Sequence, residues 1–145
     1  YSIQCKNGIG SKAFDFRITS SDGKNVKLSK VNTPYKLIVF WSMWCPHCTE
    51  MLPELLEIYK KFRDRGFEVI AICIDEEVDG WRNAVVERKL CWINAIEPDN
   101  GKNKIISEYS IDGTPVLLLI DKELSIVSHP STVKQLEVKL NQIFK

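Results

Sequence analysis

The segment LIVFWSMWCPHC, from Leu37 to Cys48, joins a continuous apolar run to a pair of cysteines three positions apart. Residues 37–41 are apolar and rich in strand-forming types, which favours a central strand buried on both faces. Pro46 then opens a helix, a position where proline costs little because its missing N–H would have no intrahelical partner. Apolar side chains recur at helical spacing as far as Asp64, and Pro53 is expected to kink this helix. The segment therefore predicts a buried strand that leads directly into an amphipathic helix, with both cysteines at the junction.

The junction gives the two cysteines different environments. Cys45 falls at or just before the first helical turn, where free backbone N–H groups and the positive end of the helix dipole meet its sulfur. Both favour the thiolate, so we expect a pKa below the free value of about 8.5. Because the thiolate is the attacking species in thiol–disulfide exchange, Cys45 is predicted to be the nucleophile. Cys48 lies one turn further in and is expected to stay a thiol until it resolves a mixed disulfide.

The two residues between the cysteines are expected to tune the redox potential. Pro46 stiffens the turn, and His47, if protonated or turned towards the sulfur, would lower the pKa of Cys45 further. Stabilising the thiolate stabilises the reduced form, which makes the disulfide a stronger oxidant, so this pair leans towards oxidation. No second C-x-x-C follows, and only His129 could add another imidazole. The sequence therefore offers too few candidate ligands for a structural zinc site, and no metal site is predicted.

Predicted strands and helices alternate on both sides of this segment. We expect further strands at 14–18, 26–28, 67–74, 92–96, 116–120 and 125–127, and further helices at 76–89, 102–109 and 133–144. Asp22-Gly23 would turn the first two strands into a hairpin, and Thr132 with Gln135 would form a capping box for the last helix. The order predicts an N-terminal tail over residues 1–12 and one α/β domain over 13–145, with a mixed sheet flanked by helices on both faces.

Composition narrows the class of protein. Twenty basic against nineteen acidic residues among 145 give a net charge of +1, which offers no bulk electrostatic case for a nucleic-acid partner. The longest apolar runs are far shorter than the 18 or so residues of a membrane span. Five cysteines, an odd number, do not suggest a disulfide framework. Cys73 lies in an apolar run and is expected to be buried, Cys91 to be packed or half-exposed, and Cys5 to lie on the tail.

Two stretches of the sequence carry a family resemblance. Residues 37–48, followed by Pro53, resemble the active-site strand and helix of thioredoxin-fold proteins. Residues 111–121, IDGTPVLLLID, resemble the second signature of that fold, which carries a cis-proline. The extra N-terminal hairpin and the insert at 76–92 make the chain most similar to the TlpA/ResA-like thiol–disulfide oxidoreductases, over roughly residues 13–144. The resemblance implies an enzyme with a thioredoxin-like fold, an N-terminal β-hairpin and a β/α insert.

The same resemblance implies roles for individual residues. Cys45 would be the nucleophile and Cys48 the resolving thiol, and their redox-active disulfide would be the only redox group, with no separate cofactor. Pro115 would be the cis-proline that faces this disulfide. The backbone of Thr114 would then pair with an extended substrate segment, a short form of β-addition. Trp44 would flank the site as an apolar wall for the substrate.

Two positions depart from the family pattern. Thioredoxins carry a buried acid on the strand before the active site, where this chain has Val39. ResA-like proteins carry a glutamate near the active-site helix at the position of Met51, with Glu50 next to it here. One residue on a helix is a rotation of about 100°, so Glu50 points in another direction. The proton of Cys48 would therefore pass to water, His47 or Glu50.

Two other functions compete with this reading. Cys48-Thr49-Glu50 suggests a thiol peroxidase of the peroxiredoxin type, which usually needs the pattern P-x-x-x-T-x-x-C. Counted back from either cysteine, the proline position holds Ile38 or Trp41, so this pattern fails. The fold could also serve as a non-catalytic metal-handling or adaptor module, which would want a further His or Met near the cysteines; Met43 and Met51 are the only methionines.

The setting of the protein is implied mainly by the resemblance. It points to a periplasmic or otherwise extracytoplasmic place in a bacterium, with the cytoplasm as the alternative. We expect protein disulfides or dithiols as substrates, an upstream redox partner, no nucleic acid, no membrane span in this chain, and a monomer. The physiological direction stays open, because the Pro-His pair leans towards oxidation while relatives of this kind are often reductants.

Overall fold

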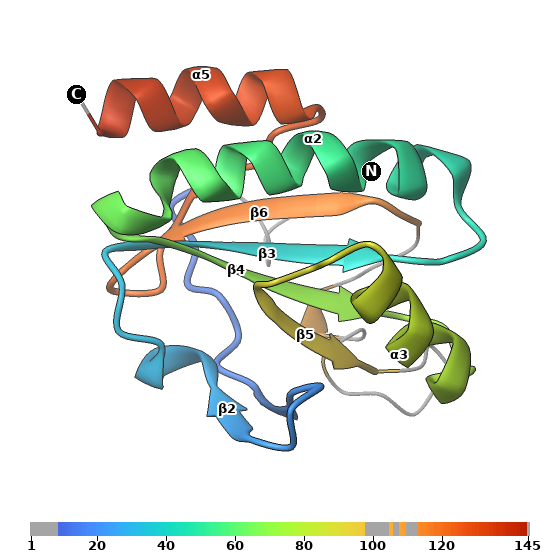
Figure 1. The fold of residues 1–145 in the computed structure, drawn as a ribbon. Helices are drawn as coiled ribbons and strands as arrows, with labels where there is room; N and C mark the ends of the chain where they lie inside the picture. The colour runs from blue at the N-terminus through green and yellow to red at the C-terminus, as the bar shows by residue number, and fades with distance from the viewer. Residues whose placement is uncertain (1–8, 98–104, 106–107, 110–112, 145) are drawn as a thin grey trace.

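A five-stranded sheet forms the centre of the fold, in the order β5–β4–β3–β6–β7 (Figure 1). The computed structural model describes residues 9–97, 105, 108–109 and 113–144. The strands of this sheet are β3 (Tyr35–Trp41), β4 (Phe67–Cys73), β5 (Ile93–Ile96), β6 (Val116–Asp121) and β7 (Ile126–Ser128). β3, β4 and β5 run parallel, whereas β6 is antiparallel to both β3 and β7. The mixed sheet predicted from the order of elements is thus confirmed.

The register of the central strand decides which loops meet beside it. β3 is the middle strand, and all its residues after the first are buried, as a strand covered on both faces requires. At its C-terminal end Trp41 pairs with Cys73 of β4, and Phe40 pairs with Val116 of β6. The loops that follow β3 and β4 and the segment that precedes β6 therefore meet at the carboxyl ends of β3 and β4, which we call the carboxyl edge of the sheet. In open α/β sheets this carboxyl edge is where ligands bind.

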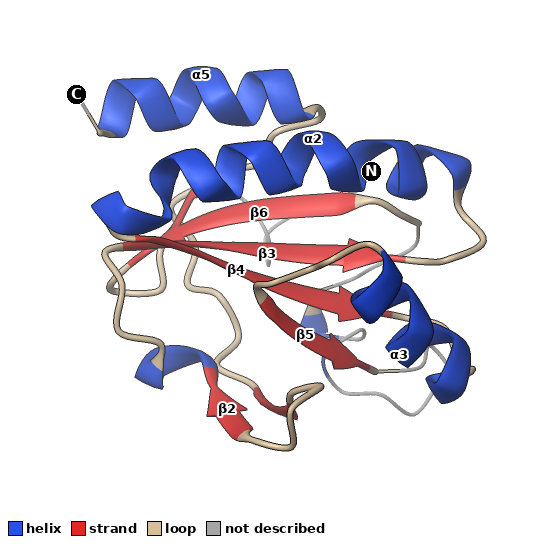
Figure 2. Ribbon diagram, in the orientation of Figure 1, coloured by secondary structure: helices blue, strands red, loops and turns tan. Residues whose placement is uncertain are grey.

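Helices α2 (Pro46–Phe62) and α5 (Val133–Ile143) lie side by side over one face of the sheet (Figures 1 and 2). α3 (Val78–Glu87) contributes Trp81 to the same apolar core. α2 runs without interruption through Pro53, ends in the 3₁₀ turn η2 (Arg63–Arg65), and is followed by Gly66. Gly66 has a φ of 108°, and a Cβ there would lie 2.7 Å from the ring of Pro34, so only glycine fits.

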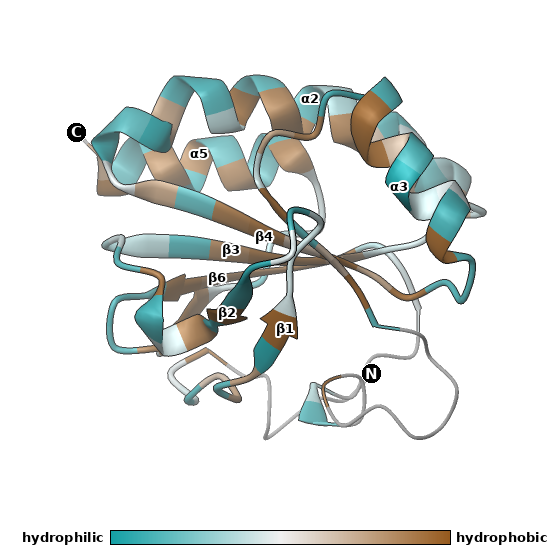
Figure 3. Cartoon of the chain, turned by 60° about the horizontal axis from the view of Figure 1, so that its bottom comes forward, coloured by the Kyte–Doolittle hydropathy of each residue, from teal (hydrophilic) through white to brown (hydrophobic). Residues whose placement is uncertain are grey.

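The N-terminal hairpin covers the opposite face (Figure 3). It consists of β1 (Arg17–Thr19) and β2 (Asn25–Lys27) and leads into the 3₁₀ turn η1 (Leu28–Lys30). Its apolar side chains share a second core with β3, β4 and β6, and the buried Ile105 and Tyr109 complete that core. The first strand begins at Arg17, later than the expected 14–18, although the N–H of Leu28 still donates to the carbonyl of Phe16 at 2.9 Å.

The ends of the chain show one difference from the sequence-based expectation. Residues 10–12, part of the expected tail over 1–12, are bonded to the sheet: Gly10 N–H donates to Ile126 O at 2.8 Å and Lys12 forms a β-bridge with Ser125. This segment therefore follows the β7 edge, where unpaired backbone groups need partners. Residues 1–8, with Cys5, and most of the expected helix at 102–109 lie outside the described residues.

The predicted cap of the last helix is confirmed with a small shift. Thr132 Oγ1 accepts the N–H of Gln135 at 3.1 Å, as an N-cap threonine does. The Gln135 side chain returns to the N–H of Ser131, at 2.8 Å, one residue before the cap. Among the described helices, none is long and apolar enough to cross a membrane.

Candidate active site

Cys45 is the N-cap residue of α2. Its backbone is extended, with φ −98° and ψ 110°, and Pro46 occupies the first helical position. The Cys45 sulfur accepts the N–H of Cys48 at 3.3 Å, and the Cys45 carbonyl accepts the N–H of Thr49 at 3.1 Å. A sulfur thus stands where Ser, Thr or Asp usually caps a helix, facing the free N–H groups of the first turn.

These contacts set the ionisation of Cys45. Burial by itself opposes the charge, but hydrogen bonds from the Cys48 thiol, from Thr114, and from the backbone N–H groups of Cys48 and His47 outweigh it. Together they lower the pKa of Cys45 below the ordinary 9.0. The physical origin is the one expected for a thiolate at a helix N-terminus.

Cys48 has the opposite environment. Its side chain is fully buried, under the first turn of α2 and within the apolar core. Burial in the first place, and then a hydrogen bond with the Cys45 sulfur, raise the pKa of Cys48 to about 11. Both cysteines are free thiols, so the structure is that of the dithiol form. The pair therefore combines an accessible sulfur that ionises easily with a buried one that holds its proton.

The segment before β6 lies next to this pair of cysteines. The Thr114–Pro115 peptide bond is cis. The Cys45 thiol donates to the carbonyl oxygen of Thr114 at 3.5 Å, although the two residues are 69 positions apart. The arrangement brings the cis Thr114–Pro115 bond next to the Cys45 sulfur.

Trp44, His47 and Glu50, close to the two cysteines in the sequence, are all exposed. Trp44 is 76% exposed and therefore does not pack in the core. The imidazole of His47 is exposed, and it is the backbone N–H of this residue that contacts the Cys45 sulfur. His47 and Glu50 line a cavity of about 430 Å³ that also reaches Pro115 and the start of α5. Glu50 is exposed, whereas its neighbour Met51 is buried, as the helical rotation requires.

Known proteins resemble this chain in sequence and in fold. The model of the AhpC/TSA family matches residues 9–129. The thiol–disulfide oxidoreductase ResA of Bacillus cereus is 34% identical over 141 residues, which cover 95% of this chain and 80% of that protein. ResA of Bacillus anthracis is 33% identical over the same shares of both chains. This chain belongs to the ResA-like thiol–disulfide oxidoreductases of the AhpC/TSA family.

Solved structures place this ResA-like enzyme in the thioredoxin fold. The thioredoxin domain of a thiol–disulfide oxidoreductase from Bacteroides vulgatus has a TM-score of 0.87 at 26% identity, covering 95% of this chain and 99% of that one. A domain of a possible thiol–disulfide isomerase from Cytophaga hutchinsonii has a TM-score of 0.82 at 28% identity, covering 94% and 92%. The fold class and the oxidoreductase activity expected from the sequence are therefore confirmed.

The structure adds one residue, Asp75, to the surroundings of the site of this ResA-like enzyme, and the sequence reasoning missed it. Asp75, just after β4, accepts hydrogen bonds from the hydroxyl of Ser42 and from the N–H of Met43, both at 2.7 Å. The available signal was its position, because a carboxylate that directly follows a buried parallel strand reaches the same edge as the residues after β3.

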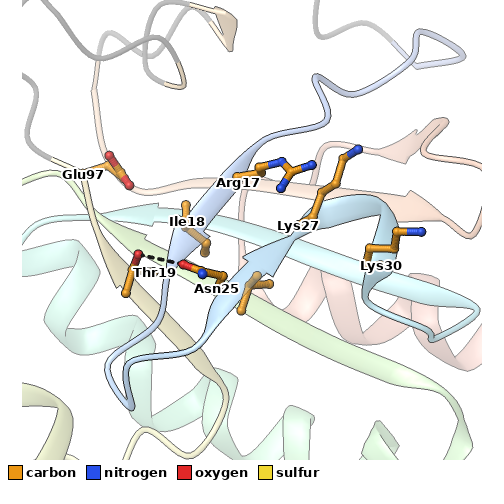
Figure 4. Close-up of a pocket in the computed structure, with 8 residues that line it drawn as sticks. Arg17, Ile18, Thr19, Asn25, Lys27, Lys30 and Glu97 are labelled. Atoms are coloured by element: carbon orange, nitrogen blue, oxygen red, sulfur yellow. Dashed lines mark hydrogen bonds between the residues drawn. The ribbon is translucent and has the colours of Figure 1, made fainter.

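Two further cysteines of the described residues, Cys73 and Cys91, do not belong to the thiol pair. Cys73 is fully buried, as expected, and burial raises its pKa to about 12; Cys91 is exposed, beyond the packed or half-exposed position expected for it. A second cavity, of about 520 Å³, lies on the hairpin among Arg17, Lys27 and Lys30 (Figure 4). Within the described residues, no group of three or more His, Cys, Asp and Glu side chains could hold a metal ion.

Proposed function

We propose that this enzyme exchanges its Cys45–Cys48 dithiol with disulfides of protein substrates through a mixed disulfide. The observation that carries the proposal is the asymmetry of the pair: the Cys45 sulfur caps α2 with a lowered pKa, while Cys48 is buried with a raised one. The Cys45 thiolate attacks one sulfur of the substrate disulfide, forms a mixed disulfide, and releases the other substrate sulfur as a thiolate.

The second step closes the active-site disulfide. Cys48 loses its proton and attacks the Cys45 sulfur, which releases the second substrate thiolate and leaves a Cys45–Cys48 disulfide. Two electrons pass from the enzyme dithiol to the substrate, and the reverse sequence oxidises a substrate dithiol. Because Cys48 holds its proton strongly, a base must take it; water, His47 and Glu50 are the candidates, and both of these side chains line the cavity that reaches Pro115.

The residues around the thiols would hold the substrate. A peptide in extended conformation would pair with the backbone of Thr114 next to the cis bond, and the exposed ring of Trp44 would cover its apolar part. Pro46 and His47 would set the potential from within the first helical turn. No cofactor other than the disulfide itself is required by this scheme.

The setting is proposed from the relatives. They are named thiol–disulfide oxidoreductases, and we propose an extracytoplasmic location for this chain. We also propose that it is a monomer whose cysteine pair is returned to its starting redox state by an upstream redox protein. The residues favour neither direction decisively, so the reduction potential against glutathione decides between a reductant and an oxidant.

Insulin reduction in the presence of dithiothreitol tests the exchange reaction. Cys45→Ser should abolish the activity, and Cys48→Ser should lose turnover while it accumulates a mixed disulfide visible on non-reducing gels. Cys91→Ser is the matched control, because that thiol is exposed but lies outside the site, and it should behave as the unmodified protein. Full activity of either active-site variant would refute the scheme. Peroxide consumption and zinc or copper uptake, measured on the same sample, test the peroxidase and metal-handling alternatives.

A further inference from the structure

The turn that carries the nucleophile is tied to the neighbouring strand by one carboxylate. Residues 42–44 lead from β3 to Cys45, the N-cap residue of α2, and Asp75 lies two positions beyond the end of β4. Its Oδ1 accepts the hydroxyl of Ser42 at 2.7 Å, and its Oδ2 accepts the backbone N–H of Met43 at 2.7 Å. The thiol of Cys73 donates to the same Oδ2 at 3.4 Å. These short bonds are of the charge-assisted kind, which are stronger than bonds between neutral groups.

Ser42, which Asp75 holds in place, forms hydrogen bonds with the segment that carries the two cysteines. Its hydroxyl oxygen accepts the N–H of Trp44 at 3.2 Å, and its carbonyl accepts the N–H of Cys45 at 3.3 Å. The backbone of Ser42 also forms a hydrogen bond with Cys48 that lowers the pKa of that thiol, against the larger effect of burial. Both thiols therefore depend on the position of one residue, and Asp75 holds the side chain of that residue.

We propose that Asp75 is a positioning residue for thiol–disulfide exchange, which holds the 42–44 turn so that the Cys45 sulfur stays over the first N–H groups of α2. The proposal deepens the proposed function, on which it rests. In the described part of the chain, the contacts of Asp75 are with Ser42, Met43 and Cys73, not with the sulfurs that react. It therefore acts through the turn and not as a proton acceptor for the substrate.

The sign of one measurable quantity separates this role from a plain charge effect. A nearby negative charge disfavours a thiolate, so removing the charge of Asp75 would by itself lower the pKa of Cys45. Loss of anchoring does the opposite, because the sulfur leaves the N–H groups that stabilise its charge. The proposal thus predicts that truncation of Asp75 raises the pKa of Cys45.

The test measures the rate of alkylation of Cys45 by iodoacetamide between pH 5 and pH 10 in Asp75→Ala, Asp75→Asn and the unmodified protein. The Ala variant should alkylate about tenfold more slowly at pH 6, the scale of one lost hydrogen bond to a charged group. The Asn variant should fall between, since its amide oxygen still accepts one donor. Asp79→Asn is the matched control, because Asp79 is exposed in the first turn of α3, and it should behave as the unmodified protein.

Two outcomes overturn the proposal: a Cys45 pKa in folded Asp75→Ala that is unchanged, or one that is lowered. Circular dichroism establishes that each variant is folded. Should Asp75→Ala fail to fold, Ser42→Ala decides instead, because it removes the hydroxyl link and leaves the Met43 contact; its Cys45 pKa should rise by a smaller amount, and no rise refutes the role. Alkylation needs no protein substrate, so failure of the proposed function appears separately, as absent insulin reduction by the unmodified enzyme.

Discussion

Brief alkylation of the fully reduced protein at pH 7 should modify Cys45 at least about tenfold faster than Cys48. The difference follows from their pKa values. A pKa of about 11 leaves about one Cys48 molecule in 10⁴ as thiolate at pH 7. A pKa below 9.0 leaves at least about one Cys45 molecule in 10². The thiolate populations therefore differ by a factor of at least about 100.

Part of this factor is offset by intrinsic reactivity. The more basic thiolate is the better nucleophile, with a Brønsted slope of about 0.4–0.5. A difference of two pKa units therefore makes the Cys48 thiolate about eightfold more reactive than the Cys45 thiolate. A ratio of at least about ten remains, and the complete burial of Cys48 increases it further. The ratio should narrow as the pH rises, because the rate of Cys45 reaches a plateau above its pKa while that of Cys48 continues to increase towards about pH 11.

Mass spectrometry after a short pulse of iodoacetamide measures both rates in one sample. Both thiols lie on the tryptic peptide 37–60, so fragmentation must assign the modified position. The same pulse in 8 M urea is the control, since unfolding removes both the helix terminus and the burial and should bring the two rates together. Equal rates in the folded protein, or faster modification of Cys48, would contradict the assigned roles.

Three further predictions test other parts of the structure. His47→Pro removes the backbone N–H that contacts the Cys45 sulfur, so the thiolate loses stabilisation and the reduction potential should become more negative by about 30 mV, the size of a tenfold change in equilibrium; His47→Ala keeps this N–H and should shift less against glutathione. Lys36→Met should raise the free energy of unfolding by about 1 kcal/mol at pH 7 in urea titrations, because Lys36 is 1% exposed and its burial lowers its pKa. That gain should shrink as the pH approaches 10.5, where the unfolded lysine also loses its proton, and a constant gain would point to packing instead. Thr132→Ala removes the cap of α5 and should cost about 1 kcal/mol in the same titration, with no effect on insulin reduction.

The sequence predicted those features that depend on residues close together in the chain. A proline after Cys45 and apolar residues at helical spacing are local signals, and they located the start of α2 at Pro46, where the structure has it. The turn at Gly23 and the cap at Thr132 were also predicted for this reason. In each case a backbone conformation or a bond between near neighbours decides the outcome, so no tertiary information was needed.

Features that depend on distant contacts were missed. The bonds from Asp75 to Ser42 and Met43 span more than thirty positions, and only the pairing of β3 with β4 brings the partners together. The β-bridge of Lys12 with Ser125 and the exposure of Cys91 likewise depend on how the ends of strands pack. The hydrophobic pattern shows which face of a strand is buried. It does not show which polar residue lies next to the loop that follows the strand.

The site combines three segments because the carboxyl ends of the parallel strands β3 and β4 lie beside the start of the antiparallel strand β6. Parallel pairing ends β3 and β4 side by side, and the antiparallel β6 starts at that same edge, so the residues after Trp41, after Cys73 and before Val116 converge. The first segment supplies the sulfur, the third supplies the cis peptide bond beside it, and the second would hold the turn in place. A ResA-like enzyme could then change its thiol chemistry through residues after β4 that never touch a sulfur of the reacting pair. The dipeptide between its two cysteines would then be one of two places that set the reduction potential.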